Sequence, residues 1–210
     1  MVKNKQNIAI LIVLIFGFSL LYFGTDGFQA FTAEKARVNN LMKDHPIFPE
    51  VTLEDSEGAK YSFSKFEGKY VLMTFLYTGC TDVCPQLEYN LAQVHDLIPS
   101  QYVGEKIEFL SISFDPTRDT PETLKKYAQY FNTDSTAWKI ARISNEEELT
   151  SLLNEFGIIV IPDDYGNFQH NSAFYLVDPN GILIEVLDYK KVEEAATIVT
   201  TILEEKVGRN

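Results

Sequence analysis

The chain contains two cysteines, Cys80 and Cys84, and both lie in the segment YTGCTDVCPQ at residues 77–86. Three residues separate them, and Pro85 follows the second. A pair at this spacing is compatible with four kinds of chemistry. These are a structural disulfide, a thiol–disulfide redox couple, a peroxide-reducing thiol with its partner, and two ligands of a soft metal ion. The secondary structure predicted around the two cysteines is needed to decide among these four chemistries.

The cysteines lie between a predicted buried strand and a predicted helix. Residues 70–77 are almost continuously apolar, which is typical of a strand buried on both faces. From Pro85 onward the apolar residues recur at helical spacing. Cys84 is therefore expected at a helix N-terminus, where free N–H groups and the helix dipole favour a thiolate. Thiolate serves redox, peroxidase and metal chemistry alike, so this position leaves those alternatives open.

The remaining pattern predicts an α/β fold. A hairpin is expected around residues 55–58, and further strands are expected at 107–114, 138–143, 173–177 and 182–187. Later helices are expected at 120–131, at 144–156 with Ser144 as N-cap, and at 192–207. Strands that alternate with helices pair in parallel, and a closing hairpin adds antiparallel strands. We therefore predict a thioredoxin-like fold with an N-terminal β-hairpin addition and a mixed central sheet flanked by helices.

The N-terminus predicts a membrane segment. Ile8 to Phe23 is apolar apart from two small residues, and Lys3 and Lys5 precede it. Its length is near the lower limit for a span, and the basic residues predict that the rest of the chain is exported. A cleaved signal peptide is the alternative. We predict an anchor or signal segment at 1–24, a tether at 25–48 that is helical around 31–42, and a folded extracytoplasmic domain at 49–210.

The composition and the predicted compartment exclude some functions. The formal net charge is −12, so phosphate groups repel the chain and nucleic acid is an unsuitable partner. Hydrophobic residues make up 45% of the chain, which is enough for a core that needs no disulfide. Outside the cytoplasm a cysteine pair becomes oxidised unless a reductant or a metal prevents it.

A metal site would need a donor besides the cysteines. Thiolates select Cu(I) and also bind zinc or iron–sulfur clusters, but a closed zinc site needs four ligands. Of the three histidines, His45 lies in the predicted tether, and His95 lies about three helical turns beyond Cys84. His170 ends a long polar loop directly before a strand, where functional residues collect. Its position alone still favours an ordinary hydrogen-bonded loop histidine.

Three segments together resemble the signature blocks of the Sco (SenC) family. They are YTGCTDVCP at 77–85, FDPTRDTPETLKKY at 114–127 and HNSAFYLVDPNG at 170–181. The resemblance extends from about Pro49 to the final helix. It implies a thioredoxin-like fold and a membrane-anchored copper protein that assists assembly of the CuA centre of cytochrome c oxidase.

The resemblance also implies roles for particular residues. Cys80, Cys84 and His170 match the copper ligands of that family, for Cu(I) or Cu(II). Asp115 matches an aspartate near the site, for which we expect an indirect role. The adjacent Arg118 and Asp119 are interpreted as a surface turn. The implied partners are the CuA subunit of cytochrome c oxidase or another copper-site client, other copper carriers or thiol reductants, and the membrane.

Several functional hypotheses remain after the resemblance. The first is a copper metallochaperone that uses all three donors. The second is a thiol–disulfide oxidoreductase that reduces the cysteines of a client, which needs both cysteines but not His170. A thiol peroxidase is a weaker alternative, based on the pattern T-x-x-C at residues 81–84 with Arg118 or Arg142 as activating cation. A structural disulfide is disfavoured because so short a loop gains little from cross-linking.

Overall fold

The computed structural model describes residues 2–25, 27, 32–131 and 137–207. The residues outside these ranges are not described. They include Met1 of the predicted anchor segment and Phe31 at the start of the predicted tether helix. The chain divides into two compact units, Met1–Asp44 and His45–Asn210.

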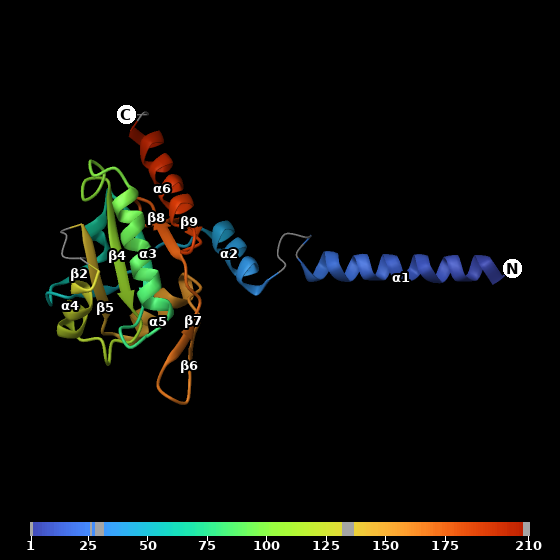
Figure 1. Cartoon of the computed structure of the whole chain (residues 1–210), viewed down its shortest axis with the longest axis horizontal. Helices are drawn as coiled ribbons and strands as arrows, with labels where there is room; N and C mark the ends of the chain where they lie inside the picture. The colour runs from blue at the N-terminus through green and yellow to red at the C-terminus, as the bar shows by residue number, and fades with distance from the viewer. Residues whose placement is uncertain (1, 26, 28–31, 132–136, 208–210) are drawn as a thin grey trace. The chain divides into compact units, whose positions relative to one another are not determined.

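The first unit contains two helices, α1 (Val2–Gly24) and α2 (Ala33–Asp44), drawn in blue in Figure 1. Within α1 the stretch Asn7–Gly24 has a mean hydropathy of 2.3, and none of it is buried in the protein. It is long and apolar enough to cross a membrane, a property it shares with signal sequences. The division of the chain into anchor, tether and domain stays a prediction.

The second unit is built on a seven-stranded sheet with the order β2-β1-β5-β4-β3-β8-β9. The strands in that order are Lys60–Ser62, Thr52–Asp55, Trp138–Ile143, Ile107–Ser113, Tyr70–Leu76, Phe174–Val177 and Leu183–Leu187. The three central strands β3, β4 and β5 are parallel, and hairpins add antiparallel strands at both edges. This is the mixed sheet with an added N-terminal hairpin that the sequence predicts.

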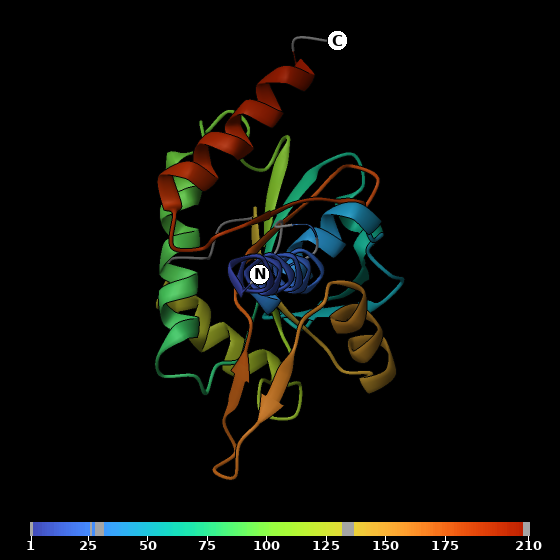
Figure 2. The same ribbon diagram turned by 90° about the vertical axis from the view of Figure 1, so that its right-hand side faces the viewer.

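Helices cover both faces of this sheet (Figure 2). On one face lie α3 (Val83–Leu97), α4 (Pro121–Gln129) and α6 (Val192–Val207), and on the other lies α5 (Glu146–Glu155). Apolar side chains of α3 and α6 pack with β-strand residues such as Leu72 and Phe109 into one buried core. On the opposite face Phe156 packs against the rings of Phe75 and Tyr175.

The cap of α5 differs from the sequence prediction. Asn145 is the N-cap, and its side chain accepts hydrogen bonds from the N–H groups of Glu147 and Glu148. The Ser144 hydroxyl instead donates to Glu54, a carboxylate on β1. The prediction of Ser144 as cap was wrong because a carboxylate distant in the sequence binds its hydroxyl.

A two-stranded sheet lies outside the main sheet and leads into β8. It consists of β6 (Val160–Pro162) and β7 (Phe168–His170), which pair with each other. Because β8 runs antiparallel to β3, the start of β8 lies beside the carboxyl end of β3. A hydrogen bond from the Thr74 hydroxyl on β3 to the Ala173 carbonyl marks this approach. The sheet topology therefore places the end of β7 near the carboxyl end of β3, where α3 begins.

One carboxyl group lies inside the core, beneath α3. Glu88 is fully buried and accepts a hydrogen bond from the Ser111 hydroxyl, which in turn accepts one from the indole N–H of Trp138. In the described part of the chain the other oxygen of Glu88 has no hydrogen-bond partner. Burial raises the pKa of Glu88 to about 8 from its ordinary 4.5, although the Ser111 hydroxyl partly offsets the increase.

This pKa predicts that stability falls as pH rises. Between pH 4.5 and 8 the Glu88 carboxyl group is deprotonated in the unfolded chain but keeps its proton in the folded chain. The free energy of unfolding therefore decreases as the pH rises through this range. The limiting slope is about 1.4 kcal/mol per pH unit. Glu88→Gln keeps an acceptor for Ser111 and has no proton to lose. We expect the free energy of unfolding of E88Q to exceed that of the wild type increasingly from pH 5 to pH 8.

The measurement is chemical denaturation of the full chain in detergent, followed by fluorescence of Trp138, the single tryptophan of the chain. The difference between the two proteins at several pH values isolates Glu88 from other titrating groups. A difference that stays constant from pH 5 to pH 8 would contradict the prediction.

Candidate thiol and imidazole site

The cysteine pair lies where β3 passes into α3. Cys80 is in the turn after the strand and is half-buried, whereas Cys84 is in the first turn of the helix and has no exposed surface. The backbone N–H of Cys84 donates to the Cys80 sulfur at 3.3 Å. Both cysteines are free thiols. Cys84 thus lies at the start of the helix and Cys80 lies in the turn before it, as the strand-to-helix pattern predicts.

His170 faces the buried cysteine. Its Nε2 lies 3.4 Å from the Cys84 sulfur, and its Nδ1 lies 3.1 Å from the carbonyl oxygen of Asn171. A carbonyl only accepts, so Nδ1 carries a proton in that bond and Nε2 is left as acceptor for the Cys84 thiol. The sequence predicts His170 at the end of a loop, but it ends β7, where it pairs with Val160.

Burial governs the protonation of both groups. Desolvation raises the pKa of the Cys84 thiol well above its usual range, and a charge on Cys80 would raise it further. Desolvation also lowers the pKa of His170. The expectation that the helix N-terminus would make Cys84 acidic was therefore wrong, because desolvation is the largest influence on the pKa of Cys84 and raises it. The pair rests as a neutral thiol beside a neutral imidazole.

Two aromatic rings pack against His170, a third packs against both of them, and sequence reasoning missed all three. The Phe114 ring centre lies 5.0 Å from that of His170, and the Tyr77 ring centre lies 6.5 Å from it. Phe168 packs edge-on against both Tyr77 and Phe114. Phe168 and His170 are two apart on a strand and share a face, which is the signal that could have identified Phe168. These rings limit the orientations that the imidazole can adopt.

The segment after β4 contacts the cysteine turn through Asp119, a residue for which the sequence predicts a surface position. Asp119 is fully buried and accepts hydrogen bonds from the N–H and the hydroxyl of Thr78, two residues before Cys80, and from the Ser113 hydroxyl. Asp115 is also buried and pairs with Arg118. Interpreting Arg118 and Asp119 as a surface turn was wrong for Asp119, whose carboxylate connects the β4 segment to the cysteine turn.

The donors are adjacent but do not form a closed metal site. Within the described ranges no group of three or more His, Cys, Asp or Glu side chains is placed to hold a metal ion. Cys84 and His170 are in contact, and the Cys80 sulfur is in contact with the Cys84 backbone. Two sulfurs and a neutral imidazole suit a soft metal chemically.

The other histidines lie away from these donors, as the sequence predicts. The His95 ring packs against Phe109 and Trp138 and hydrogen-bonds to Asp96. His45 bonds through Nδ1 to the carbonyl of Leu183.

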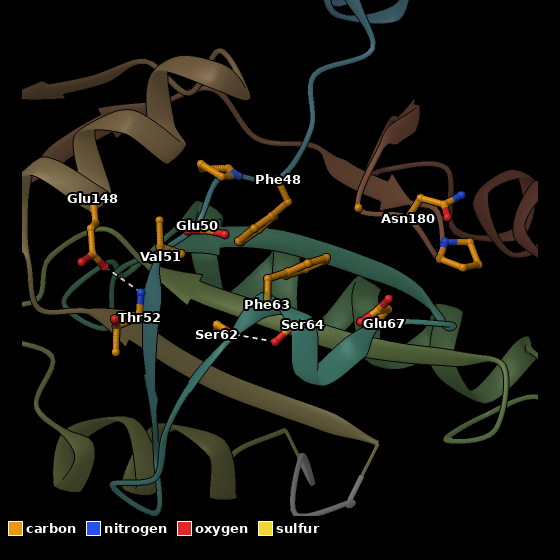
Figure 3. Close-up of a pocket in the computed structure, with 13 residues that line it drawn as sticks. Phe48, Glu50, Val51, Thr52, Ser62, Phe63, Ser64, Glu67, Glu148 and Asn180 are labelled. Carbon is orange, nitrogen blue, oxygen red and sulfur yellow. Dashed lines mark hydrogen bonds between the residues drawn. The ribbon is translucent and has the colours of Figure 1, made fainter.

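A separate cavity of about 670 Å³ lies on the side of the domain near β1 and the segment that precedes it (Figure 3). The rings of Phe48 and Phe63 stack at its centre, and Glu148 accepts a hydrogen bond from the Thr52 N–H at its edge. None of the described residues that line it is a cysteine or a histidine. The cavity therefore has no part in thiol or imidazole chemistry.

The fold and the site together define a class of protein. A mixed α/β sheet with a cysteine pair at a strand–helix junction and a histidine against it is a thioredoxin-like domain with a thiol and imidazole site. A model of the SCO1/SenC family matches residues 41–205, so the chain belongs to this family.

Individual relatives agree with this assignment. The SCO1 protein homolog of Bacillus subtilis is 28% identical over 144 residues, which cover 68% of this chain and 72% of that protein. The structure of Bradyrhizobium japonicum ScoI with copper bound is similar with a TM-score of 0.62 and 26% identity, covering 74% of this chain and 98% of that one. BsSco, described as having a disulfide switch and as a member of the Sco family of cytochrome c oxidase assembly proteins, has a TM-score of 0.59 at 23% identity, covering 73% and 95%. This last likeness shows the shared thioredoxin-like fold.

The burial of the two thiols predicts different reactivities. Cys80 is half-buried and Cys84 has no exposed surface, so a neutral alkylating reagent reaches Cys80 first. We expect iodoacetamide to modify Cys84 in Cys80→Ser at least roughly tenfold more slowly than it modifies Cys80 in Cys84→Ser. Mass spectrometry of the reduced full chain measures both rates, with the denatured chain as control. Equal rates in the folded protein would contradict the described burial.

Proposed function

We propose that the protein is a membrane-anchored, extracytoplasmic copper metallochaperone that assists assembly of the CuA site of cytochrome c oxidase. The observation that carries the proposal is the contact at 3.4 Å between the Cys84 sulfur and His170 Nε2, with the Cys80 sulfur beside them. Membership of the SCO1/SenC family and the copper bound by ScoI support it.

The chemistry of the donors supports copper as the cargo. Cys80 and Cys84 as thiolates and His170 through Nε2 make a soft set that suits Cu(I), and an added oxygen ligand would suit Cu(II). A metal lowers the pKa of the thiols that it binds, which offsets the desolvation of Cys84. Cys80 is the more exposed of the two thiols, so a client thiolate would displace Cys80 before Cys84.

The placement of this site in the cell is part of the proposal. Residues 1–24 would anchor the chain in the membrane, residues 25–48 would act as a tether, and residues 49–210 would form the extracytoplasmic copper domain. The apolar stretch Asn7–Gly24 of α1 and the basic residues Lys3 and Lys5 before that stretch support this arrangement. The partners would be the CuA subunit or another copper-site client, and copper carriers or thiol reductants that load the site.

Replacing the histidine tests the proposed ligand set. We expect His170→Asn to weaken copper binding by the reduced chain at least roughly tenfold. Loss of a residue that only hydrogen-bonds to a metal ligand already weakens metal binding by about this factor, and loss of the ligand itself should weaken binding at least as much. It should also abolish nitrogen coupling from imidazole in the spectrum of the Cu(II) form. The measurement is copper titration against a competing chelator, with electron paramagnetic resonance.

The same substitution at His45 is a matched control. His45 has a φ of 46°, a left-handed conformation that asparagine tolerates, and its ring is hydrogen-bonded far along the chain from the cysteines. His45→Asn should bind copper like the wild type. If His170→Asn binds with unchanged affinity and spectrum, the three-donor site is wrong.

A second candidate function is reduction of the client's cysteines. The observation that favours it is the pairing of a half-buried Cys80 with a buried Cys84, which are suited to be the attacking and the resolving thiol. The Cys80 thiolate would attack a client disulfide, and the sulfur released from the client would leave as a thiolate. Cys84 would then displace the reduced client, leaving the Cys80–Cys84 disulfide. The two functions are compatible, since a copper site fills only when its cysteines are reduced.

Trapping distinguishes this second function. Cys84→Ser removes the resolving thiol, so we expect a mixed disulfide to accumulate between Cys80 and a client peptide that carries a CuA-type cysteine pair in its oxidised form. Cys80→Ser should trap little, and His170→Asn in the Cys84→Ser background should trap as well as Cys84→Ser alone. Non-reducing gels and mass spectrometry measure the adduct. Absence of the adduct together with intact copper binding leaves metal delivery as the single function.

The remaining alternatives from the sequence receive less support. A thiol peroxidase needs an activated thiolate, whereas the Cys84 thiol is buried and its pKa is raised. Of the two arginines considered for activation, Arg118 pairs with Asp115 and Arg142 pairs with Glu54. A structural disulfide has no counterpart in the structure, where both cysteines are free.

A further inference from the structure

The hairpin that carries His170 is held by an arginine from another segment. Arg118, in the turn after β4, donates through Nη1 to the carbonyl oxygen of Gly166 at 2.6 Å. Gly166 lies in the turn between β6 and β7, where it has a φ of 81°. Through Nε, Arg118 donates to the carboxylate of Asp115. One side chain thus joins the hairpin turn to the segment after β4.

The same guanidinium lies against the rings near His170. Its carbon is 5.1 Å from the ring centre of Phe168 on β7 and 5.6 Å from that of Tyr77 at the end of β3. A guanidinium over aromatic faces is attracted by their negative quadrupole. Phe168 is two residues from His170 on the same strand. A contact that fixes the Phe168 side chain therefore also restricts the position of the His170 imidazole.

The hairpin needs such contacts because its own pairing is minimal. β6 and β7 form a two-stranded sheet of three residues each, separate from the seven-stranded sheet. Two-stranded hairpins are marginally stable by themselves. A backbone-to-side-chain bond from the Phe168 N–H to the Tyr77 hydroxyl, at 3.2 Å, is another link to the main sheet.

The segment that holds the hairpin is itself fixed to the cysteine turn. Asp119, the residue after Arg118, is fully buried and accepts two hydrogen bonds from Thr78. Neighbouring residues of one turn therefore contact the two parts of the site, Asp119 the cysteine turn and Arg118 the histidine hairpin. Their spacing sets the distance between the cysteines and His170.

We propose that Arg118 is the positioning residue that holds the β6–β7 hairpin so that His170 Nε2 faces the cysteines. Its effect on copper rests on the proposed function, whereas its effect on the hairpin does not. Arginine is required because its rigid fork reaches the Asp115 carboxylate and the Gly166 carbonyl at once while its plane lies near Phe168. Lysine has a single compact ammonium in place of the separate Nε and Nη1 donors that reach Asp115 and Gly166, and it has no planar group to lie against Phe168.

The chain offers a matched control for this requirement. Arg142 also donates through Nε to a carboxylate, Glu54 at 2.8 Å, and through Nη1 to a carbonyl, Pro116 at 2.7 Å. Its bonds are to β1 and to the segment after β4, not to the hairpin. Arg118→Lys and Arg142→Lys therefore remove the same bonding pattern at two places and retain the charge in both.

The first experiment measures amide hydrogen exchange in the reduced, metal-free full chain in detergent. In Arg118→Lys we expect the amides of residues 160–170 to exchange roughly fivefold faster than in the wild type, while those of β3 and β4 stay unchanged and report an intact fold. In Arg142→Lys the hairpin amides should exchange at the wild-type rate. Unchanged hairpin exchange in Arg118→Lys, or equal acceleration in both variants, overturns the proposal.

The second experiment titrates the same proteins with Cu(I) and records the spectrum of the Cu(II) form. We expect Arg118→Lys to bind copper roughly fivefold more weakly with reduced imidazole nitrogen coupling, and Arg142→Lys to match the wild type. Faster hairpin exchange with unaltered copper binding overturns a positioning role for Arg118. If the wild type binds no copper, the proposed function fails, and the exchange data alone decide whether Arg118 holds the hairpin.

Discussion

The antiparallel pairing of β8 with β3 is the constraint on which the site depends. It places the start of β8 beside the end of β3, and the Thr74 bond to the Ala173 carbonyl fixes that approach. As a result His170 contacts Cys84, although the two residues are 86 positions apart in the sequence. A parallel arrangement would have put the histidine at the opposite end of the strand, away from the helix that begins with the cysteines. The sheet topology therefore brings the donors together before any side chain does.

Burial at this edge of the sheet then determines the charge of the site. Desolvation shifts the pKa of Cys84 upward and that of His170 downward, so both favour their neutral forms. A helix N-terminus favours a thiolate, but desolvation is the largest influence on the pKa of Cys84 and raises it. A neutral Cys84 thiol is poorly reactive toward small oxidants, and a bound cation would favour its thiolate form. Burial of Cys84 therefore restrains the reactivity of this thiol until a cation binds.

Local sequence pattern predicts the elements well and their long-range contacts poorly. The apolar run at 70–77, the helical period after Pro85 and the spacing of Cys80 and Cys84 depend on neighbours in sequence, so they are predictable. The cap of α5 passes to Asn145 because Glu54, distant in the chain, binds Ser144. The strand that ends at His170 is too short to give a periodic signal, so the sequence predicts a loop there. Contacts between residues that are far apart in the sequence leave no periodic pattern in the sequence from which they could be predicted.

The burial of Asp119 shows the same limit and explains how the site keeps its shape. In sequence Arg118 and Asp119 form an ordinary polar turn before a helix. In the structure Asp119 satisfies the N–H and hydroxyl of Thr78, while Arg118 bonds the Gly166 carbonyl on the other side. A buried carboxylate with three donors is rigid, whereas a half-exposed guanidinium bond opens more easily. The cysteine side of the site is thus held by buried bonds to Asp119, whereas the histidine hairpin is held by the more exposed bonds of Arg118.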